Sequence, residues 1–359
     1  MSRALLGRSN LKRCSAGLSD QTLRIRALSN KQTASTQATP AQDVVHPALE
    51  VAQRSSISEF SSTDYASYTT SIPPTTAQLS YANKYFYTSE PKFLLGLAKF
   101  RALPMSNVPE VAFLGRSNVG KSSLLNALLH RNNAKLAHVS SRPGRTREMN
   151  AYGVHGAGWV AGQELLDDGS RPRIWSGRGG LVVLDMPGYG KASRNEWGTE
   201  IEKYLVGRKQ LRRTFVLIDG EHGVKRSDIE LLEILRFNGI THQIVLSKID
   251  KVLLPSGKAT IDAMNRNLGK LQGIFEEVKR KIMAKERRGV AALNDMLTTS
   301  AEVDVPFASG NKLGVDVLRW EVLSAAGLAS DPTGKLLKVE YTIGQDSSDG
   351  PWATAEPQY

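Results

Sequence analysis

The sequence predicts an α/β fold built on a doubly wound, mostly parallel sheet flanked by helices. From residue 109 onward, short apolar runs alternate with segments of helical periodicity, which is typical of strands joined by crossover helices. Strands are expected at 110–114, 181–184, 214–218 and 243–246. Helices are expected at 122–130, 197–206 and 228–237. Both ends of the chain lack this alternation, and we expect them to be disordered extensions.

Residues 1–42 have the composition of an organelle transit segment. The stretch is rich in Arg and Ser, and Asp20 is its only acidic residue, as in import sequences. Because Arg is prominent, we expect import into the mitochondrial matrix. Import into plastids and a basic arm that stays attached are the alternatives.

The whole-chain composition limits the partners and the chemistry. The chain has 359 residues, a formal net charge of +12 and one cysteine, Cys14. A positive surplus favours polyanionic partners, either nucleic acid or an acidic membrane face. A single cysteine excludes an internal disulfide and a cysteine zinc site. No run approaches the roughly 20 apolar residues that span a bilayer, so we expect no stable membrane insertion.

The remaining chain divides into three further parts. Residues 43–105 are interpreted as a linker, unpacked to about residue 80, and a short aromatic packing element. Residues 106–330 form the main domain, with insertions near 153–180 and 252–300. In the first insertion we expect a long hairpin or loop, and in the second one amphipathic helix over 258–290 with a basic far end. Residues 331–359 are predicted to be a disordered tail.

The octapeptide 115–122 carries the strongest chemical signal. It fits the pattern Gly-x4-Gly-Lys-Ser between a predicted strand and a predicted helix, the context that supports a phosphate-binding loop (P-loop). Its backbone amides would face phosphate oxygens at a helix N-terminus. Lys121 would reach the β- and γ-phosphates, and the Ser122 hydroxyl would bind Mg²⁺. The predicted nucleotide-binding residues here are Gly115, Arg116, Ser117, Asn118, Val119, Gly120, Lys121, Ser122 and Ser123.

A second motif lies at the end of a predicted strand. Asp185 closes the apolar run 181–184 and precedes Gly188 by three residues, a spacing that holds Mg²⁺ through water and brings a Gly amide to the γ-phosphate. Thr146, in a loop between the two motifs, would complete Mg²⁺ ligation and be released on hydrolysis. The predicted metal ligands are Ser122, Thr146 and Asp185. The predicted catalytic residues are Lys121, Thr146 and Gly188.

The segment 247–250 predicts which nucleotide base the protein binds. Asp250 can accept hydrogen bonds from guanine N1 and N2, whereas adenine offers no such donor pair. The aliphatic stem of Lys248 can lie over the base. We therefore expect binding of GTP and GDP, with Ser247, Lys248, Asp185, Gly188 and Asp250 added to the nucleotide-binding residues.

These motifs, with 109–113, 142–146 and 185–190, resemble EngB-type (YihA-type) GTPases of the TrmE-Era-EngA-EngB-Septin-like class. The resemblance runs from about residue 106 to 328. It implies GTP hydrolysis and a role in assembling the large ribosomal subunit, here in mitochondria, on that subunit or its rRNA. It also implies that Phe307, Ala308 and Ser309 form the last guanine-contacting loop, with Ser300–Ala301 as the alternative.

Three positions affect the expected mechanism. Tyr189 stands where many GTPases place a water-orienting Gln, so we expect slow intrinsic hydrolysis. The alternative function is a nucleotide-dependent protein-binding switch with negligible hydrolysis that does not act on the ribosome. Asn118 resembles the asparagine by which some GTPases hold an activating K⁺, and a loop-stabilising amide is the alternative. Ser247 replaces the family's usual Asn or Thr, and its hydroxyl can still bridge loops.

Basic residues outside these motifs are candidates for contact with ribosomal RNA. A solvated surface is the alternative for each of them. A membrane-surface GTPase ranks last, because no basic amphipathic anchor remains once the N-terminal segment is removed. The sequence does not indicate an oligomeric state. The candidates are Lys191, Arg194, Arg208, Lys209, Arg212, Arg213 and the basic end of the helix expected at 258–290.

Overall fold

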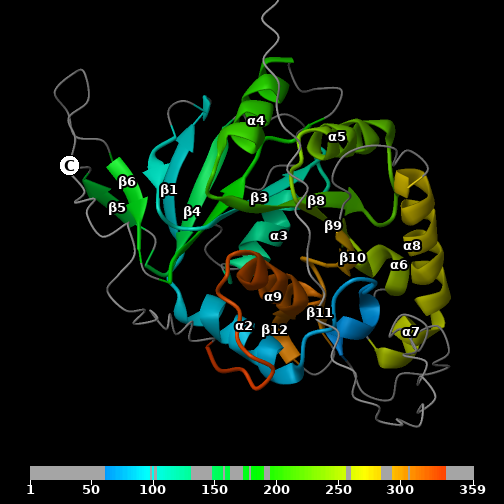
Figure 1. Ribbon diagram of the computed structural model, residues 1–359. Helices are drawn as coiled ribbons and strands as arrows, with labels where there is room; N and C mark the ends of the chain where they lie inside the picture. The colour runs from blue at the N-terminus through cyan, green and yellow to red at the C-terminus, as the bar shows by residue number, and fades with distance from the viewer. Residues whose placement is uncertain are drawn as a thin grey trace, which may run out of the picture. The chain divides into compact units, whose positions relative to one another are not determined.

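A sheet of seven described strands forms the core of the protein in the computed structural model (Figure 1). The chain divides into residues 1–44 and 45–359, and all described residues belong to the second unit. The predictions for 1–42, for Thr146 and Phe307, and for 337–359 lie outside the described residues. The structure describes 61–97, 99–100, 103–130, 148–156, 158–161, 173–177, 179–189, 195–255, 260–283, 293–305 and 308–336.

The sheet is mostly parallel and doubly wound, as predicted. Strand β3 pairs in parallel with β7 and β8, and β9 pairs in parallel with β8 and β10. Among the described strands of this sheet, antiparallel pairing occurs only around β4, which pairs with β7 and with the edge strand β1. In spatial order the strands are β1 (Lys92–Leu97), β4 (Met149–Val154), β7 (Leu181–Asp185), β3 (Glu110–Gly115), β8 (Leu211–Asp219), β9 (His242–Ser247) and β10 (Leu293–Thr298).

Helices cover both faces of the sheet, which is why the central strands are apolar along their whole length. Successive residues of β3 enter different packing clusters: Val111 and Phe113 belong to one, and Ala112 and Leu114 to the other. The first cluster includes helices α2 (Thr76–Thr88), α3 (Lys121–Leu128) and α9 (Val315–Ala325). The second includes α4 (Asn195–Gly207), α5 (Arg226–Phe237) and α8 (Leu268–Met283).

Residues 61–88 pack onto the main domain, so the prediction of an unpacked linker to about residue 80 is wrong from residue 61. A 3-10 helix, η1 (Ser62–Tyr65), buries Tyr65 completely. The Asp295 Oδ1 of β10 accepts the Thr69 and Thr70 N–H groups, at 2.5 and 2.8 Å. Ser67 also exchanges backbone hydrogen bonds with Met296, at 2.9 and 2.8 Å, so residues 67–70 cover part of an edge strand that would otherwise be open. The polar composition of this segment gave no indication that it packs, because its partners on β10 are more than 200 positions away in the sequence.

The two insertions differ from each other. The first forms the predicted hairpin, in which β5 (Gly158–Ala161) pairs with β6 (Arg173–Ser176), and β6 also pairs with β2 (Met105–Ser106). The second contains α6 (Asp250–Leu253), α7 (Ile261–Arg266), α8 and the sheet strand β10.

The prediction of one helix over 258–290 is wrong, because the chain breaks at Asn267. The Asn267 amide donates to the carbonyls of Leu253 and Ala263, at 3.0 and 3.1 Å, and so ends α7 there. The predicted apolar face is buried as expected at Leu271, Phe275, Val278 and Ile282.

The first residues of the predicted C-terminal tail pack against the main domain. In the predicted tail, Pro332 accepts a hydrogen bond from the Thr75 hydroxyl at 2.8 Å, and Gly334 approaches the Ala77 carbonyl. Residues 331–336 therefore pack against the start of α2 and are not part of a free tail. Within the described residues, no helix has the length and apolar character to cross a membrane.

Candidate nucleotide site

The predicted P-loop connects the end of β3 to the start of α3. The chain turns sharply at Asn118 and Gly120, whose φ angles are 65° and 94°. A Cβ on Gly115 would lie 2.6 Å from Val119 Cγ1, so this position needs glycine. The strand–loop–helix arrangement directs backbone amides to the N-terminus of α3, which favours anions.

Lys121, Ser122 and Asp185 meet at the start of α3. Lys121 Nζ pairs with Asp185 Oδ1, and both side chains are buried. The Ser122 hydroxyl donates to Asp185 Oδ2 over 3.4 Å. The structure therefore brings together the cation expected to hold phosphate and two of the three predicted metal ligands.

Gly188 lies directly against the P-loop. A Cβ placed there would be 2.9 Å from the Ser117 hydroxyl and 3.1 Å from the Ser117 nitrogen. The next residue, Tyr189, exchanges backbone hydrogen bonds with the loop, from its N–H to the Gly115 carbonyl and from the Ser117 N–H to its carbonyl, both at 3.3 Å. The segment after Asp185 thus packs on the P-loop through glycine-sized contacts.

The predicted guanine motif lies at the carboxyl end of β9. The Ser247 hydroxyl donates to the Val119 carbonyl at 2.7 Å, which is the loop-bridging contact expected of it. Lys248 adopts a left-handed conformation with φ 55°, and its side chain passes within 4 Å of the position of a Cβ on Gly120. Asp250 is buried at the start of α6. The base motif and the phosphate loop are therefore joined directly.

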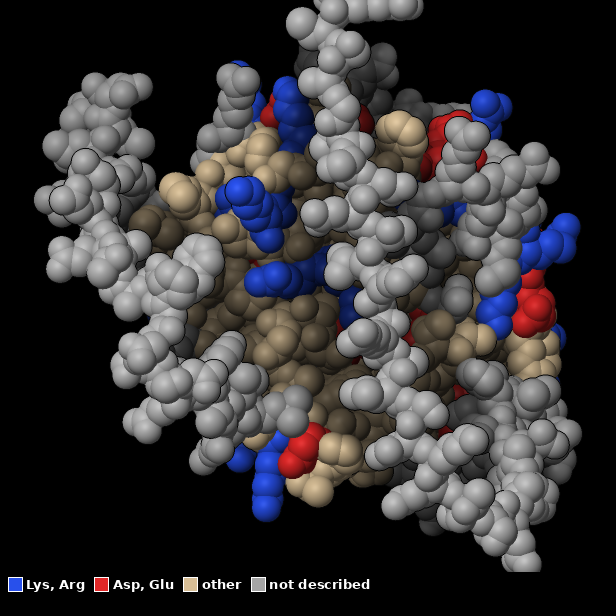
Figure 2. Space-filling view, in the orientation of Figure 1, with Lys and Arg blue, Asp and Glu red and all other residues tan. Residues whose placement is uncertain are grey.

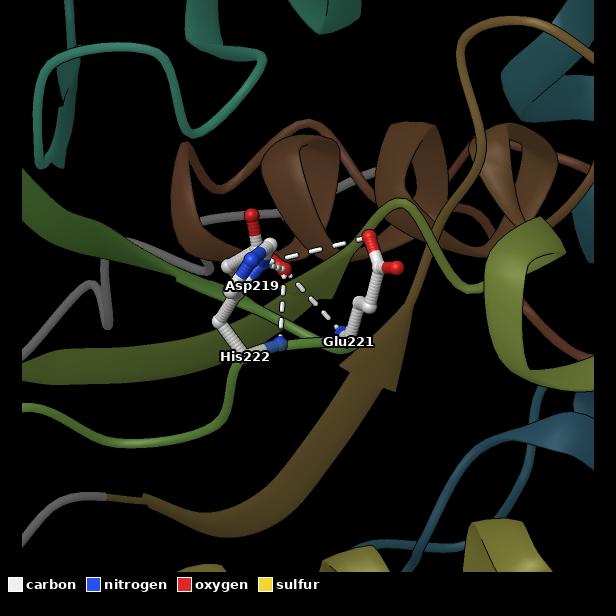
Figure 3. A group of neighbouring side chains, drawn as sticks. All are labelled: Asp219, Glu221 and His222. Atoms are coloured by element: carbon white, nitrogen blue, oxygen red, sulfur yellow. Dashed lines mark hydrogen bonds and ion pairs between the residues drawn. The ribbon is translucent and has the colours of Figure 1, made fainter.

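Asp219, which the sequence analysis missed, supports this motif from the end of β8. Its Oδ2 accepts a hydrogen bond from Lys248 Nζ at 2.9 Å, and its Oδ1 accepts the Glu221 and His222 N–H groups at 3.0 Å (Figure 3). Burial alone would raise the pKa of Asp219, but the hydrogen bonds from Lys248 and His222 outweigh it and hold the pKa below its usual range. An Asp at the carboxyl end of a parallel strand was the available signal.

Asp219, Glu221 and His222 also have ligand atoms within 4.8 Å of one another, close enough for one metal ion. The Asp219 oxygens are already used by Lys248 and by backbone N–H groups. The group therefore supports the base motif through Asp219.

The structure brings Thr299, which directly precedes the alternative Ser300–Ala301, to the base motif. Thr299, at the end of β10, accepts the Ile249 N–H at 3.1 Å. Ala308 and Ser309 instead lie in β12 (Ala308–Lys312), which pairs with β11 (Asp304–Val305) in a separate hairpin. In sequence, this hairpin lies between β10 and α9. The role of Phe307–Ser309 at the base stays a prediction.

Two of the basic residues expected to face RNA form ion pairs within the protein instead. Arg208 pairs with Glu110, and Arg213 pairs with Glu321, with N–O distances of 2.6 Å. Lys209 and Arg212 are exposed, whereas Lys191 and Arg194 lie outside the described residues. On the face drawn in Figure 2, the described Lys and Arg side chains are scattered among other residues.

Comparison with known proteins agrees with this site. Residues 110–248 match the family described as "50S ribosome-binding GTPase". The "Probable GTP-binding protein EngB" of Rhizobium etli is 34% identical over 247 residues, which cover 66% of this chain and 93% of that protein. The protein of the same name from Mesorhizobium japonicum is 38% identical over 192 residues, covering 51% of this chain and 81% of its own.

Solved structures give weaker likenesses. A crystal structure of a probable GTP-binding protein engB aligns with a TM-score of 0.33 and 18% identity, over 61% of this chain and 98% of that one. A crystal structure of Era in complex with MgGDPNP and nucleotides of 16S ribosomal RNA aligns with a TM-score of 0.37 and 20% identity. The alignment covers 67% of this chain and 60% of that one. The phosphate and base motifs, together with 34% identity to the Rhizobium etli protein over 93% of its length, show that the chain is a GTPase of the EngB family.

Proposed function

We propose that this GTPase acts in assembly of the large ribosomal subunit in the mitochondrial matrix and depends on Mg²⁺. The match of its nucleotide-binding part to a family described as "50S ribosome-binding GTPase" carries the proposal. The net charge of +12 supports a polyanionic partner. The Arg-rich, acid-poor residues 1–42 support the location.

The residues at the start of α3 suit Mg²⁺ and phosphate. Mg²⁺ prefers oxygen ligands such as carboxylate and hydroxyl groups, and Asp185 and Ser122 offer one of each within 3.4 Å. When bound, the ion would neutralise charge on the terminal phosphates. We propose that Lys121, which pairs with Asp185 at the same point, holds these phosphates and that the Gly188 amide contacts the terminal one; the close packing of Gly188 against Ser117 supports this. Thr146 is proposed as a further ligand from the sequence.

Base selection is proposed to rest on Asp250, with Lys248 over the base. The ion pair between Asp219 and Lys248 fixes the Lys248 side chain next to Gly120. The bond from Ser247 to Val119 holds the two loops at a fixed separation. Such preorganisation lowers the entropy lost when the nucleotide binds.

One contact favours the second candidate function, a nucleotide-dependent protein-binding switch with negligible hydrolysis. The Tyr189 hydroxyl donates to Asp228 on α5 and so points to a residue outside the P-loop. A phenol held in this way does not orient an attacking water as Gln does. Stimulation of turnover by ribosomal particles separates the two candidates, because only the ribosome-acting enzyme should be stimulated.

Cosedimentation tests the proposed partner. The purified chain, loaded with GDP or a non-hydrolysable GTP analogue, is spun with mitochondrial large subunits at two salt concentrations. We expect binding with the analogue, loss with GDP, and weaker binding at higher salt. Equal binding in both nucleotide states, or none, would remove the ribosome from the proposal. Asp185→Ala provides the matched control, because it should abolish the difference between the nucleotides.

Location is tested separately. The full chain carrying a C-terminal fluorescent tag should enter mitochondria, and replacing the basic residues of 1–42 by Gln should leave it outside. Mitochondrial import of the substituted chain would contradict the role of this segment.

A further inference from the structure

Asp228, at the third position of α5, joins parts of the chain that are distant in sequence. Its carboxylate is fully buried. Its Oδ1 accepts the Tyr189 hydroxyl at 2.8 Å and lies 3.1 Å from Arg116 Nε. Its Oδ2 accepts the Lys225 N–H at 2.8 Å, which caps the start of α5. Acidic side chains are almost never fully buried unless paired, so these contacts account for its position.

Two of these partners belong to the nucleotide site. Arg116 is the second residue of the P-loop, and Tyr189 directly follows Gly188. The contact with Arg116 is one of charge, because its Nε makes no directed hydrogen bond among the described residues. Together with the backbone bonds of Tyr189 to Gly115 and Ser117, the Asp228 contacts connect the P-loop, the Gly188 segment and α5.

The state of the Tyr189 phenol fits a holding role. Burial, and then the charge and hydrogen bond of Asp228, raise the pKa of Tyr189 well above its usual value. The phenol therefore stays protonated at neutral pH and remains a hydrogen-bond donor. The Tyr189 hydroxyl is hydrogen-bonded to Asp228 of α5. Tyr189 can therefore affect the nucleotide site only by fixing the backbone of its neighbour Gly188.

We propose that Asp228 is a positioning residue of the GTPase reaction, which through Tyr189 and Arg116 holds Gly188 against the P-loop, ready for the terminal phosphate of GTP. A segment held in place before the ligand binds loses less entropy on binding. GDP lacks the phosphate that the Gly188 amide would contact. The contribution of Asp228 should therefore be selective for GTP, whereas a purely structural cap of α5 would affect both nucleotides equally.

The test compares Tyr189→Phe, Asp228→Asn and the double variant in the full chain. Tyr189→Phe removes only the hydrogen bond to Asp228, and we expect affinity for a non-hydrolysable GTP analogue and the single-turnover rate to fall about tenfold. GDP affinity should stay nearly unchanged, although the thermal midpoint should fall by a few degrees because the buried Asp228 carboxylate loses one hydrogen bond. Asp228→Asn keeps an oxygen for the Lys225 N–H but loses the charge that pairs with Arg116, so it should show the same selectivity. The double variant should lose less than the product of the two single effects, because they share one contact.

Arg226→Ala is the matched control on α5, since Arg226 is exposed and pairs with Glu230 of the same helix. It should leave both affinities unchanged. Equal losses of affinity for GDP and the analogue would overturn the proposal in favour of simple capping. A gain in affinity for the analogue relative to GDP would overturn it too, since the contact would then hold Gly188 away from the phosphate. Unchanged analogue affinity and turnover in Tyr189→Phe would equally reject it.

Discussion

Lys248 of the base motif and Asp219 at the end of β8 form an ion pair, with Nζ 2.9 Å from Oδ2. The pair fixes a lysine whose backbone is in the left-handed region, at φ 55°. Lys248 is one-third exposed, so solvent screens part of the attraction. The value of the pair is therefore mainly geometric, because it keeps the Lys248 stem beside Gly120.

Asp219→Asn should weaken GDP binding about fivefold, because Lys248 loses its charged partner. Titration of a fluorescent GDP analogue at constant salt measures the effect. Glu221→Gln is the control, because the Glu221 side chain is half exposed. An equal loss in both variants would show that the charge of the whole turn matters and not the pair.

The same pair sets an expectation for pH. The pKa of Asp219 lies below its usual range in the folded protein. The unfolded chain therefore takes up this proton first, and the stabilisation is present above the ordinary carboxylate pKa and lost as the pH falls through the folded pKa. We expect the difference in unfolding free energy between wild type and Asp219→Asn to be constant near neutrality and to shrink only in acid. A change in this difference near neutral pH would contradict the assignment to Asp219.

Asp250→Asn should reverse base preference. The amide offers one acceptor and one donor where the carboxylate offers two acceptors, which suits xanthine better than guanine. We expect GDP affinity to fall about 100-fold or more and xanthosine diphosphate to bind better than GDP. Competition binding with both nucleotides measures this. Unchanged GDP affinity would exclude Asp250 from the base site.

Ser247→Ala should loosen the link between the two loops. The substitution removes the bond to the Val119 carbonyl, which is 2.7 Å long, at a cost of about 1 kcal/mol. That corresponds to about fivefold weaker binding of both GDP and GTP. Ser247→Thr retains the hydroxyl and should bind both nucleotides normally. An equal loss of nucleotide affinity in Ser247→Thr would show that the size of the side chain matters and not the hydrogen bond.

Turnover should be faster in K⁺ than in Na⁺ when ribosomal RNA is present, if Asn118 holds a monovalent cation. Asn118→Gly is the informative variant, since Gly accepts the φ of 65° found here while losing the amide. We expect it to remove the K⁺ dependence and to retain GDP binding. Equal turnover in both salts would leave Asn118 as a loop-stabilising residue.

Arg319→Leu should destabilise the whole domain. Arg319 is buried and donates to the carbonyls of Ala127 and Leu128, at 2.7 and 3.1 Å, and to the Asn83 side chain at 2.8 Å. It thus satisfies the last carbonyls of the P-loop helix and ties α2 to it. We expect the free energy of unfolding to fall by about 2–4 kcal/mol. Urea unfolding measures this, and a loss below about 0.5 kcal/mol, the size of a surface effect, would contradict the capping role.

The contacts of Asp228, Asp219 and Arg319 could not be predicted from the sequence, although each residue was visible in it. Asp219 lies 29 positions from Lys248, and Arg319 lies 236 from Asn83. Periodicity reports only whether a residue faces a core, and not which distant residue it meets there. For the same reason Arg208 and Arg213 looked like surface charges, although they pair with Glu110 and Glu321.

The amino-acid sequence alone was enough to predict the parallel sheet, the P-loop, Asp185 and the base motif around Asp250. Each of these is encoded within a short contiguous stretch, by strand or helix period and by residues such as Gly115 that the local backbone requires. The packing of residues 67–70 against β10, the position of Thr299 beside Ile249, and the contacts of Asp228 with Tyr189 and Arg116 are visible only in the three-dimensional structure. These relationships depend on which elements pack together, and packing is a property of the whole chain.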